Sequence, residues 1–222
     1  MTRAVVVDYG AGNLVSIEQA LRRVGADVRV VDRGSDVRDD DLLVVPGVGA
    51  AAPAMERLRD AGLVEPILAW IAQDRPFLGI CLGLQLLFDG SDEDGATTLG
   101  VIPGRTVELG GAPTLPHIGW NQVERARPHA AFEGIMDGAD FYFVHSYAGR
   151  PEAPAAGSAT LATTTHGEPF VSAVARGRLL GVQFHPERSG ENGLRMLANV
   201  VRLADHVSRD RVGPAVHAAG PG

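Results

Sequence analysis

The sequence predicts a single α/β domain in which a mixed, mainly parallel sheet is flanked by helices, with a flavodoxin-like core. In the first half of the chain, short apolar runs alternate with segments of helical periodicity. The apolar runs are rich in Val, Ile and Leu without polar alternation, which is typical of strands buried on both faces of a parallel sheet. A length of 222 residues with 45% hydrophobic residues fits one such domain.

The first half reads as alternating strands and helices. Strands are expected at residues 4–7, 28–31, 42–45 and 77–80. Apolar residues at helical spacing predict helices at residues 13–24, 53–72 and 82–88, the second of them broken near Gly62. Because each strand is followed by a helix, neighbouring strands are expected to run parallel.

The second half predicts a different arrangement. Short strands are expected at residues 105–109, 120–124, 140–144, 159–164, 171–175 and 179–184. Gly and Pro separate them, which favours hairpins or a mixed sheet edge on the same core. A closing helix is expected at residues 192–203. The domain is therefore expected to span residues 1–204, and residues 205–222 are expected to form a flexible C-terminal tail.

Composition excludes several classes of function. The formal net charge is −7 and no run of Lys or Arg occurs, so nucleic acid is not an expected partner. No apolar stretch approaches the roughly 20 residues that a membrane helix needs, and the N-terminal apolar run is too short for a signal peptide. We therefore expect a soluble, cytoplasmic protein without membrane association.

Cofactor and metal signals are weak. Gly10 and Gly12 follow the first strand, but Val15 stands where a dinucleotide-binding motif needs its third glycine. With one cysteine and dispersed histidines, no pair has the usual metal-ligand spacing. We expect neither a cofactor nor a metal.

Cys81, the single cysteine, is a candidate nucleophile. It lies in the pentapeptide Gly-Ile-Cys-Leu-Gly at 79–83, between an expected strand and an expected helix. Two glycines around a nucleophile are typical of the sharp strand-to-helix turn called a nucleophile elbow. The amides and dipole at the start of the next helix lower a thiol pKa and can hold an oxyanion. The pentapeptide alone fits a buried structural cysteine equally well.

His185 and Glu187 follow the expected strand at 179–184. In an extended segment, residues two apart point to the same side, and Pro186 favours an extended His185. The carboxylate could then orient an imidazole that serves the thiol. Taken alone, this pattern fits a surface His and Glu better.

A third segment, Pro46-Gly47-Val48-Gly49, also follows an expected strand. Its glycines allow close backbone approach to a ligand, and its amides could form an oxyanion hole together with that of Leu82. In isolation, the segment fits an ordinary strand-to-helix turn better.

Together these segments resemble the class I, or triad, glutamine amidotransferases. They are most similar to the glutaminase subunits of imidazole glycerol phosphate synthase. The resemblance covers about residues 4–203, in order. The Cys81 and His185-Pro-Glu187 segments carry the likeness to the superfamily. The likeness to the narrower group is carried by Asp8-Tyr-Gly-Ala-Gly-Asn13-Leu14, Gly-Trp120-Asn121 and Tyr142-Phe-Val-His145.

The resemblance implies roles for individual residues. It makes Cys81 the nucleophile, His185 the general acid and base, and Glu187 the residue that orients His185. It implies oxyanion-hole amides at Val48 and Leu82, substrate contacts at Gly47, Gln85 and Ser146, and a partner face that includes Asn13, Trp120, Tyr142 and His145.

The implied reaction is the hydrolysis of L-glutamine without a cofactor. The ammonia would pass to the cyclase subunit of the synthase, which is a separate (β/α)8 barrel, for histidine biosynthesis. Three alternatives remain: the glutaminase subunit of another synthase, a Cys peptidase or γ-glutamyl hydrolase on the same fold, and a non-catalytic binding module. The Asp8–Leu14 and Trp120-Asn121 segments oppose the first alternative. Gln85 and the partner-like surface oppose the second, and the intact Cys, His and Glu oppose the third.

Overall fold

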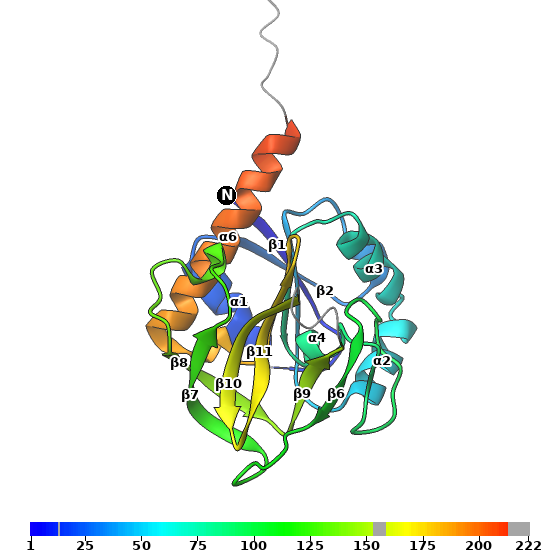
Figure 1. The fold of residues 1–222 in the computed structure, drawn as a ribbon. Coiled ribbons are helices and arrows are strands. Elements are labelled where there is room, and N and C mark those ends of the chain that lie inside the picture. The colour runs from blue at the N-terminus through cyan, green and yellow to red at the C-terminus, as the bar shows by residue number, and fades with distance from the viewer. Residues whose placement is uncertain (13, 153–158, 213–222) are drawn as a thin grey trace, which may run out of the picture.

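The computed structural model describes residues 1–12, 14–152 and 159–212, with side chains up to residue 205. Within these residues, a nine-stranded mixed sheet forms the centre of the molecule (Figure 1). In spatial order its strands are β2 (Asp27–Val31), β1 (Arg3–Val7), β3 (Leu42–Gly47), β4 (Phe77–Cys81), β12 (Leu179–Val182), β11 (Glu168–Arg176), β10 (Thr160–His166), β7 (His117–Arg125) and β8 (Ala139–His145).

The strands from β2 to β12 run parallel, and those from β12 to β8 run antiparallel. The predicted mixed α/β sheet is therefore confirmed. The strands β3, β4 and β12 lie side by side in the parallel half, so their carboxyl ends meet at one edge. Ligands bind at this edge in open α/β sheets.

Helices cover both faces of the parallel half. Val6 and Val44 pack with Ile17 of α1 (Leu14–Arg23) and Met196 of α6 (Gly190–Val212) in one core cluster. The residues between them along the strands face the opposite side, as the two-residue repeat of a strand requires. There Val5 and Val45 pack against α2 (Ala51–Asp60) and α3 (Val64–Ala72). The predicted break of the 53–72 helix near Gly62 is confirmed.

A second, three-stranded sheet was not predicted. It consists of β5 (Gly90–Ser91), β6 (Gly104–Glu108) and β9 (Tyr147–Pro151). Figure 1 shows β6 and β9 side by side next to the short helix α4 (Leu82–Gln85). In β9, Gly149 and Pro151 interrupt the apolar pattern, so the sequence contained little signal for a strand.

Two predicted helix boundaries were wrong. The helix expected at 82–88 ends at Gln85, because the amides of Leu87 and Phe88 donate to carbonyls three residues back, those of Leu84 and Gln85, instead of four residues back as in an α-helix. The closing helix α6 continues to Val212, past its expected end at residue 203. The remainder of the expected tail, residues 213–222, lies outside the described residues.

Within the described part of the chain, no helix is long and apolar enough to cross a membrane.

Candidate active site

Cys81 occupies a sharp turn between β4 and α4. Its backbone has φ 52° and ψ −107°, a conformation that L-residues rarely adopt. A Cβ atom on Gly83 would clash with the Val45 carbonyl oxygen, and one on Gly79 would lie 2.6 Å from the Gly83 carbonyl oxygen. Both glycines are therefore needed for the chain to turn this tightly. The geometry is that of a nucleophile elbow.

His185 and Glu187 form a buried hydrogen-bonded pair. His185 Nδ1 lies 2.8 Å from Glu187 Oε1, and both side chains are nearly inaccessible. The expectation that an extended segment aligns the two residues was wrong: Pro186–Arg188 is a 3₁₀ turn, and only His185 is extended. The turn is held by Ser189, whose Oγ donates to the His185 carbonyl at 2.6 Å.

The imidazole of His185 interacts electrostatically with Cys81. Its Nε2 is buried and has no hydrogen-bond partner by distance and angle among the described residues. Burial lowers the pKa of His185, but the charge of Cys81 together with the hydrogen bond and charge of Glu187 raises it to about 10. At neutral pH this favours an imidazolium beside the Cys81 sulfur, and such a positive charge stabilises a thiolate, the form in which cysteine is a nucleophile.

A polar residue that sequence reasoning missed contacts the thiol. Gln183 is fully buried and its Nε2 donates to Cys81 Sγ at 3.5 Å. Its Oε1 accepts from Nε2 of Gln85 at 3.2 Å, and that same Nε2 donates to the Tyr147 carbonyl at 2.7 Å. The sequence did contain a signal for this residue, because Gln183 is the one polar side chain within the apolar run at 179–184.

A cavity of about 200 Å³ opens beside Cys81. The predicted site residues Val48, Gln85 and Ser146 line it together with Cys81, and the rest of its lining is Gly49, Ala50, Glu93, Pro116, Val144, His145 and Tyr147. Gly47 and Leu82 lie outside this lining. Gly47 pairs with Cys81 across β3 and β4, and Leu82 begins α4 directly after Cys81.

His145 is not on the surface, as a residue of the expected partner face would be. It is 6% exposed, lines the cavity, and places its Nδ1 2.9 Å from the Tyr147 carbonyl. Its Nε2 lies 3.2 Å from Nδ1 of His117. Burial lowers the pKa of His145 to about 3 and that of His117 to about 4. Both rings are therefore neutral at neutral pH.

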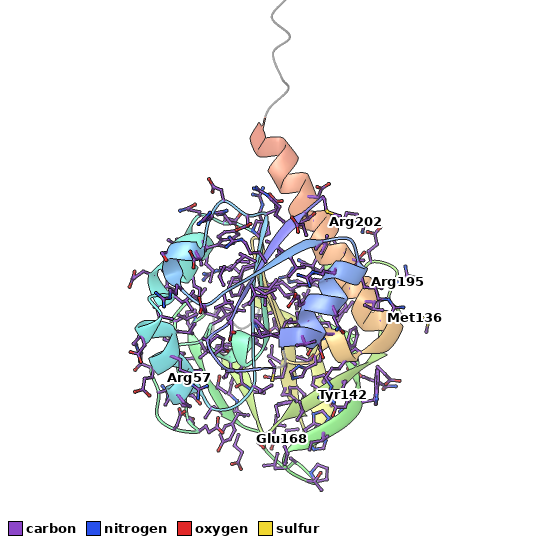
Figure 2. The ribbon with its side chains drawn as sticks, turned by 180° about the vertical axis from the view of Figure 1, so that it is seen from behind. Arg57, Met136, Tyr142, Glu168, Arg195 and Arg202 are labelled. Carbon is purple, nitrogen blue, oxygen red and sulfur yellow. The ribbon has the colours of Figure 1, made fainter. Side chains whose placement is uncertain are left out.

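Trp120 and Tyr142 do come together on an accessible surface. They pair across β7 and β8, with ring centroids 6.1 Å apart, and Trp120 is 57% exposed. The Arg188 guanidinium lies over the Tyr142 ring at 4.2 Å. Figure 2 shows Tyr142 and Glu168 toward the end of the molecule opposite Arg202. Asn13, also predicted for this face, lies outside the described residues.

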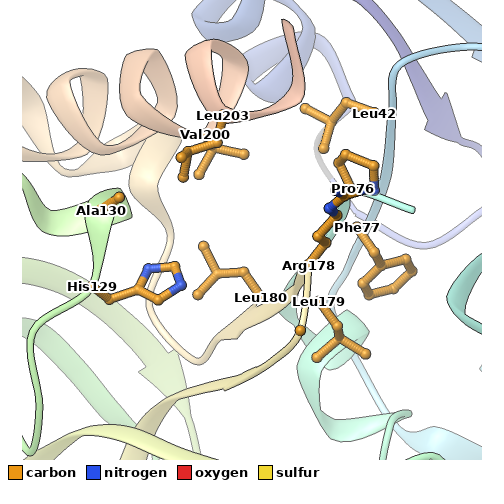
Figure 3. Close-up of a pocket in the computed structure, with 11 residues that line it drawn as sticks. Leu42, Pro76, Phe77, His129, Ala130, Arg178, Leu179, Leu180, Val200 and Leu203 are labelled. Atoms are coloured by element: carbon orange, nitrogen blue, oxygen red, sulfur yellow. The ribbon is translucent and has the colours of Figure 1, made fainter. Parts of the chain in front are cut away.

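A second cavity, of about 250 Å³, lies at the other end of the sheet. Phe77 and Leu179, the first residues of β4 and β12, line it, whereas Cys81 is the last residue of β4. Figure 3 shows apolar side chains around it, with Val200 and Leu203 projecting from the helix and His129 on the opposite wall. It takes no part in the site at Cys81. Nowhere in the described residues do three or more His, Cys, Asp or Glu side chains gather as they would to hold a metal.

Residues 5–203 match the family Glutamine amidotransferase class-I. The chain belongs to the class I glutamine amidotransferase family, and its elbow cysteine and buried His–Glu pair agree with that class.

Relatives of this chain carry a more specific name than that of the family. It is 46% identical over 206 residues to imidazole glycerol phosphate synthase subunit HisH of Microcystis aeruginosa, covering 91% of this chain and 96% of the relative. It is 47% identical over 204 residues to the protein of the same name from Symbiobacterium thermophilum, covering 91% and 95%.

Solved structures share the fold at lower identity. A glutamine amidotransferase from Thermotoga maritima superimposes with a TM-score of 0.62 at 18% identity, over 96% of this chain and 86% of that one. PurLQS from Thermotoga maritima gives a TM-score of 0.70 at 17% identity, over 91% and 99%.

Proposed function

We propose that this chain is the glutaminase subunit of an imidazole glycerol phosphate synthase. It hydrolyses L-glutamine to glutamate and ammonia, and the ammonia passes to a cyclase subunit for imidazole glycerol phosphate formation in histidine biosynthesis. The identity to HisH proteins over nine-tenths of the chain supports this. The observation that carries the chemistry is the strained Cys81 beside the buried His185–Glu187 pair.

The site residues account for each chemical step. The Cys81 thiolate attacks the side-chain carbonyl carbon of glutamine, and the resulting oxyanion accepts from the amides of Val48 and Leu82. His185 gives its proton to the departing ammonia, leaving a glutamyl thioester on Cys81. His185 then takes a proton from water, which attacks the thioester and releases glutamate and the thiolate. Glu187 holds Nδ1 of the imidazole throughout. The steps need no cofactor.

The cavity beside Cys81 is the proposed substrate site. Gln85 and Ser146 line it and would contact the bound glutamine. Gly47, the other residue proposed for substrate binding, directly precedes Val48 and pairs with Cys81 across β3 and β4.

The proposed partner is a separate cyclase subunit, forming a heterodimer. The accessible pair Trp120 and Tyr142 forms the proposed contact surface, together with Asn13. Neither nucleic acid nor a membrane is involved, and the protein is cytoplasmic under this proposal.

The test is glutamate formation from glutamine by the purified chain, measured alone and with the cyclase and its ribotide substrate. We expect glutamate in the complex, and none from the Cys81→Ala complex. The Cys81→Ala complex should still form imidazole glycerol phosphate from ammonium salts, because the cyclase site lies elsewhere. A wild-type complex that produces no glutamate would overturn the proposal.

A further inference from the structure

The hydrogen bonds around Gln183 have a determined direction. The Tyr147 carbonyl can only accept, so the atom of Gln85 that lies 2.7 Å from it must be the amide nitrogen. That nitrogen also lies 3.2 Å from Gln183, which must therefore present its oxygen there. The other end of the Gln183 amide is then the nitrogen, and it faces Cys81 Sγ at 3.5 Å.

The environment keeps Gln183 in this orientation. Its side chain is fully buried, and its backbone amide donates to the Ser172 carbonyl at 2.9 Å. Rotating the amide by 180° would set its nitrogen against the Gln85 nitrogen and its oxygen against the sulfur. The two nitrogens, both donors, would then repel each other, and the oxygen would repel the sulfur when Cys81 is a thiolate. The N–H of Gln183 is thus directed at the sulfur before any substrate arrives.

We propose that Gln183 is a positioning residue for glutamine hydrolysis: its amide N–H stabilises and aims the Cys81 thiolate, while its oxygen holds Gln85 in the orientation needed for substrate. The role in hydrolysis rests on the proposed function. Hydrogen bonds to an ionised acceptor are roughly twice as strong as neutral ones, so the N–H of Gln183 favours thiolate over thiol. His185 supplies the positive charge and Gln183 a fixed neutral donor.

The same contacts decide what Gln85 can offer the substrate. Both hydrogens of its amide nitrogen are used, one by Tyr147 and one by Gln183. Gln85 lines the cavity, and its side-chain carbonyl oxygen is the polar group that can still bind a substrate there. It can therefore only accept hydrogen bonds, which fits the ammonium or amide N–H groups of glutamine and not its carboxylate.

The test separates positioning of the thiolate from simple filling of the core. Gln183→Met has similar length and is apolar, but cannot donate an N–H. Asn199→Leu is the matched control, because Asn199 is also a buried amide, donating to the carbonyls of Ala131 and Glu133 far from Cys81. The measurement is the rate of Cys81 alkylation by iodoacetamide as a function of pH, with the full chain.

We expect the pH midpoint of alkylation to rise by about one unit in Gln183→Met, since a hydrogen bond to the charged form of a group lowers its pKa. One unit below the wild-type midpoint, the alkylation rate should then fall about tenfold. Asn199→Leu should retain the wild-type midpoint even if its melting temperature falls. A wild-type midpoint in folded Gln183→Met would overturn the proposal.

A measurement on the wild-type chain covers the case in which Gln183→Met does not fold. The side-chain amide resonances of Gln183 in a ¹⁵N NMR spectrum should move with the same pH midpoint as alkylation. Resonances that stay constant through that midpoint would overturn the proposal. Neither readout requires glutamine to be hydrolysed. Failure here would leave the proposed function standing, and failure of the proposed function would leave the contact with the thiolate standing.

Discussion

At the scale of single residues, the site depends on backbone positions where a side chain cannot fit. Cys81 has a positive φ, which typically costs of order 1–3 kcal/mol and persists where the surroundings enforce it. The close contacts at Gly79 and Gly83 supply that enforcement. A sulfur at the tip of such a turn is presented toward the cavity at the end of the sheet.

Glu187→Gln tests the role of the carboxylate. The amide can still accept from His185 Nδ1, but its loss of charge removes one of the interactions that raise the pKa of His185. By analogy with serine hydrolase triads, we expect the variant to retain roughly 10- to 100-fold more activity than His185→Ala. Glutamate production in the cyclase complex measures both. Equal losses in Glu187→Gln and His185→Ala would contradict a supporting role.

Gly47→Ala tests the packing under the site. An added Cβ would clash with the Tyr9 hydroxyl and lie 3.1 Å from Leu82 Cβ. We expect destabilisation of about 1–3 kcal/mol, the usual cost of overpacking, measured by urea unfolding.

Tyr9→Phe provides the partner in a double-mutant cycle. The Tyr9 hydroxyl is buried without a hydrogen-bond partner among the described residues, so its removal alone should cost little. The double variant should recover part of the loss from Gly47→Ala. Strict additivity of the two changes would argue against this contact.

At the scale of elements, the 3₁₀ turn Pro186–Arg188 and the β7–β8 pair arrange the buried polar groups. The turn places Glu187 Oε1 2.8 Å from His185 Nδ1. Across β7 and β8, His117 and His145 are direct register partners and share a hydrogen bond. The carbonyl that His145 contacts, Tyr147, begins β9 of the second sheet.

The neutral His145 should make stability depend on pH. Its folded pKa is lowered to about 3, against an ordinary value of 6.5. Between these values the unfolded chain binds a proton that the folded chain does not, so stability falls as pH falls from 6.5 to about 3. One such group contributes a slope of up to about 1.4 kcal/mol per pH unit. His145→Asn should show a smaller slope by urea unfolding between pH 4 and 6.5. An unchanged slope would contradict this.

At the scale of the whole molecule, the sheet separates two cavities. The parallel strands carry Cys81 to one edge, while the apolar cavity at Phe77 and Leu179 lies at the opposite edge. The exposed Trp120 belongs to the antiparallel half of the sheet, next to the edge strand β8. The proposed catalytic residues come from the parallel half, so the proposed chemistry and the proposed partner contact use different halves of one sheet.

Trp120→Ala should weaken assembly with the cyclase. Exposed tryptophans at interfaces often contribute 2 kcal/mol or more, so we expect the dissociation constant to rise at least about tenfold, measured by calorimetry. Met136→Ala is the control, because Met136 is 82% exposed and precedes β8 rather than lying on the Trp120–Tyr142 pair. Glutamine hydrolysis at saturating cyclase should stay near wild type. Equal weakening in both variants would argue against a contact surface centred on Trp120.

The sequence alone determined the α/β class, the order of the main strands and helices, and the family resemblance that assigned roles to Cys81, His185 and Glu187. These depend on local signals: apolar runs, helical periodicity and the spacing of glycines around a nucleophile. The elbow at Cys81 and the His185–Glu187 hydrogen bond both join residues close in the chain, so short motifs could indicate them.

Only the tertiary structure decided which groups surround these residues. Gln183 reaches Cys81 across 102 positions of sequence, and Gln85 reaches Tyr147 across 62. The burial of His145 depends on β7 and the second sheet, which no local pattern encodes. A side chain's exposure and hydrogen-bond partners are set by the segments that fold against it. The local sequence therefore indicated the proposed reacting groups, and long-range packing determined the orientation and protonation of the groups around them.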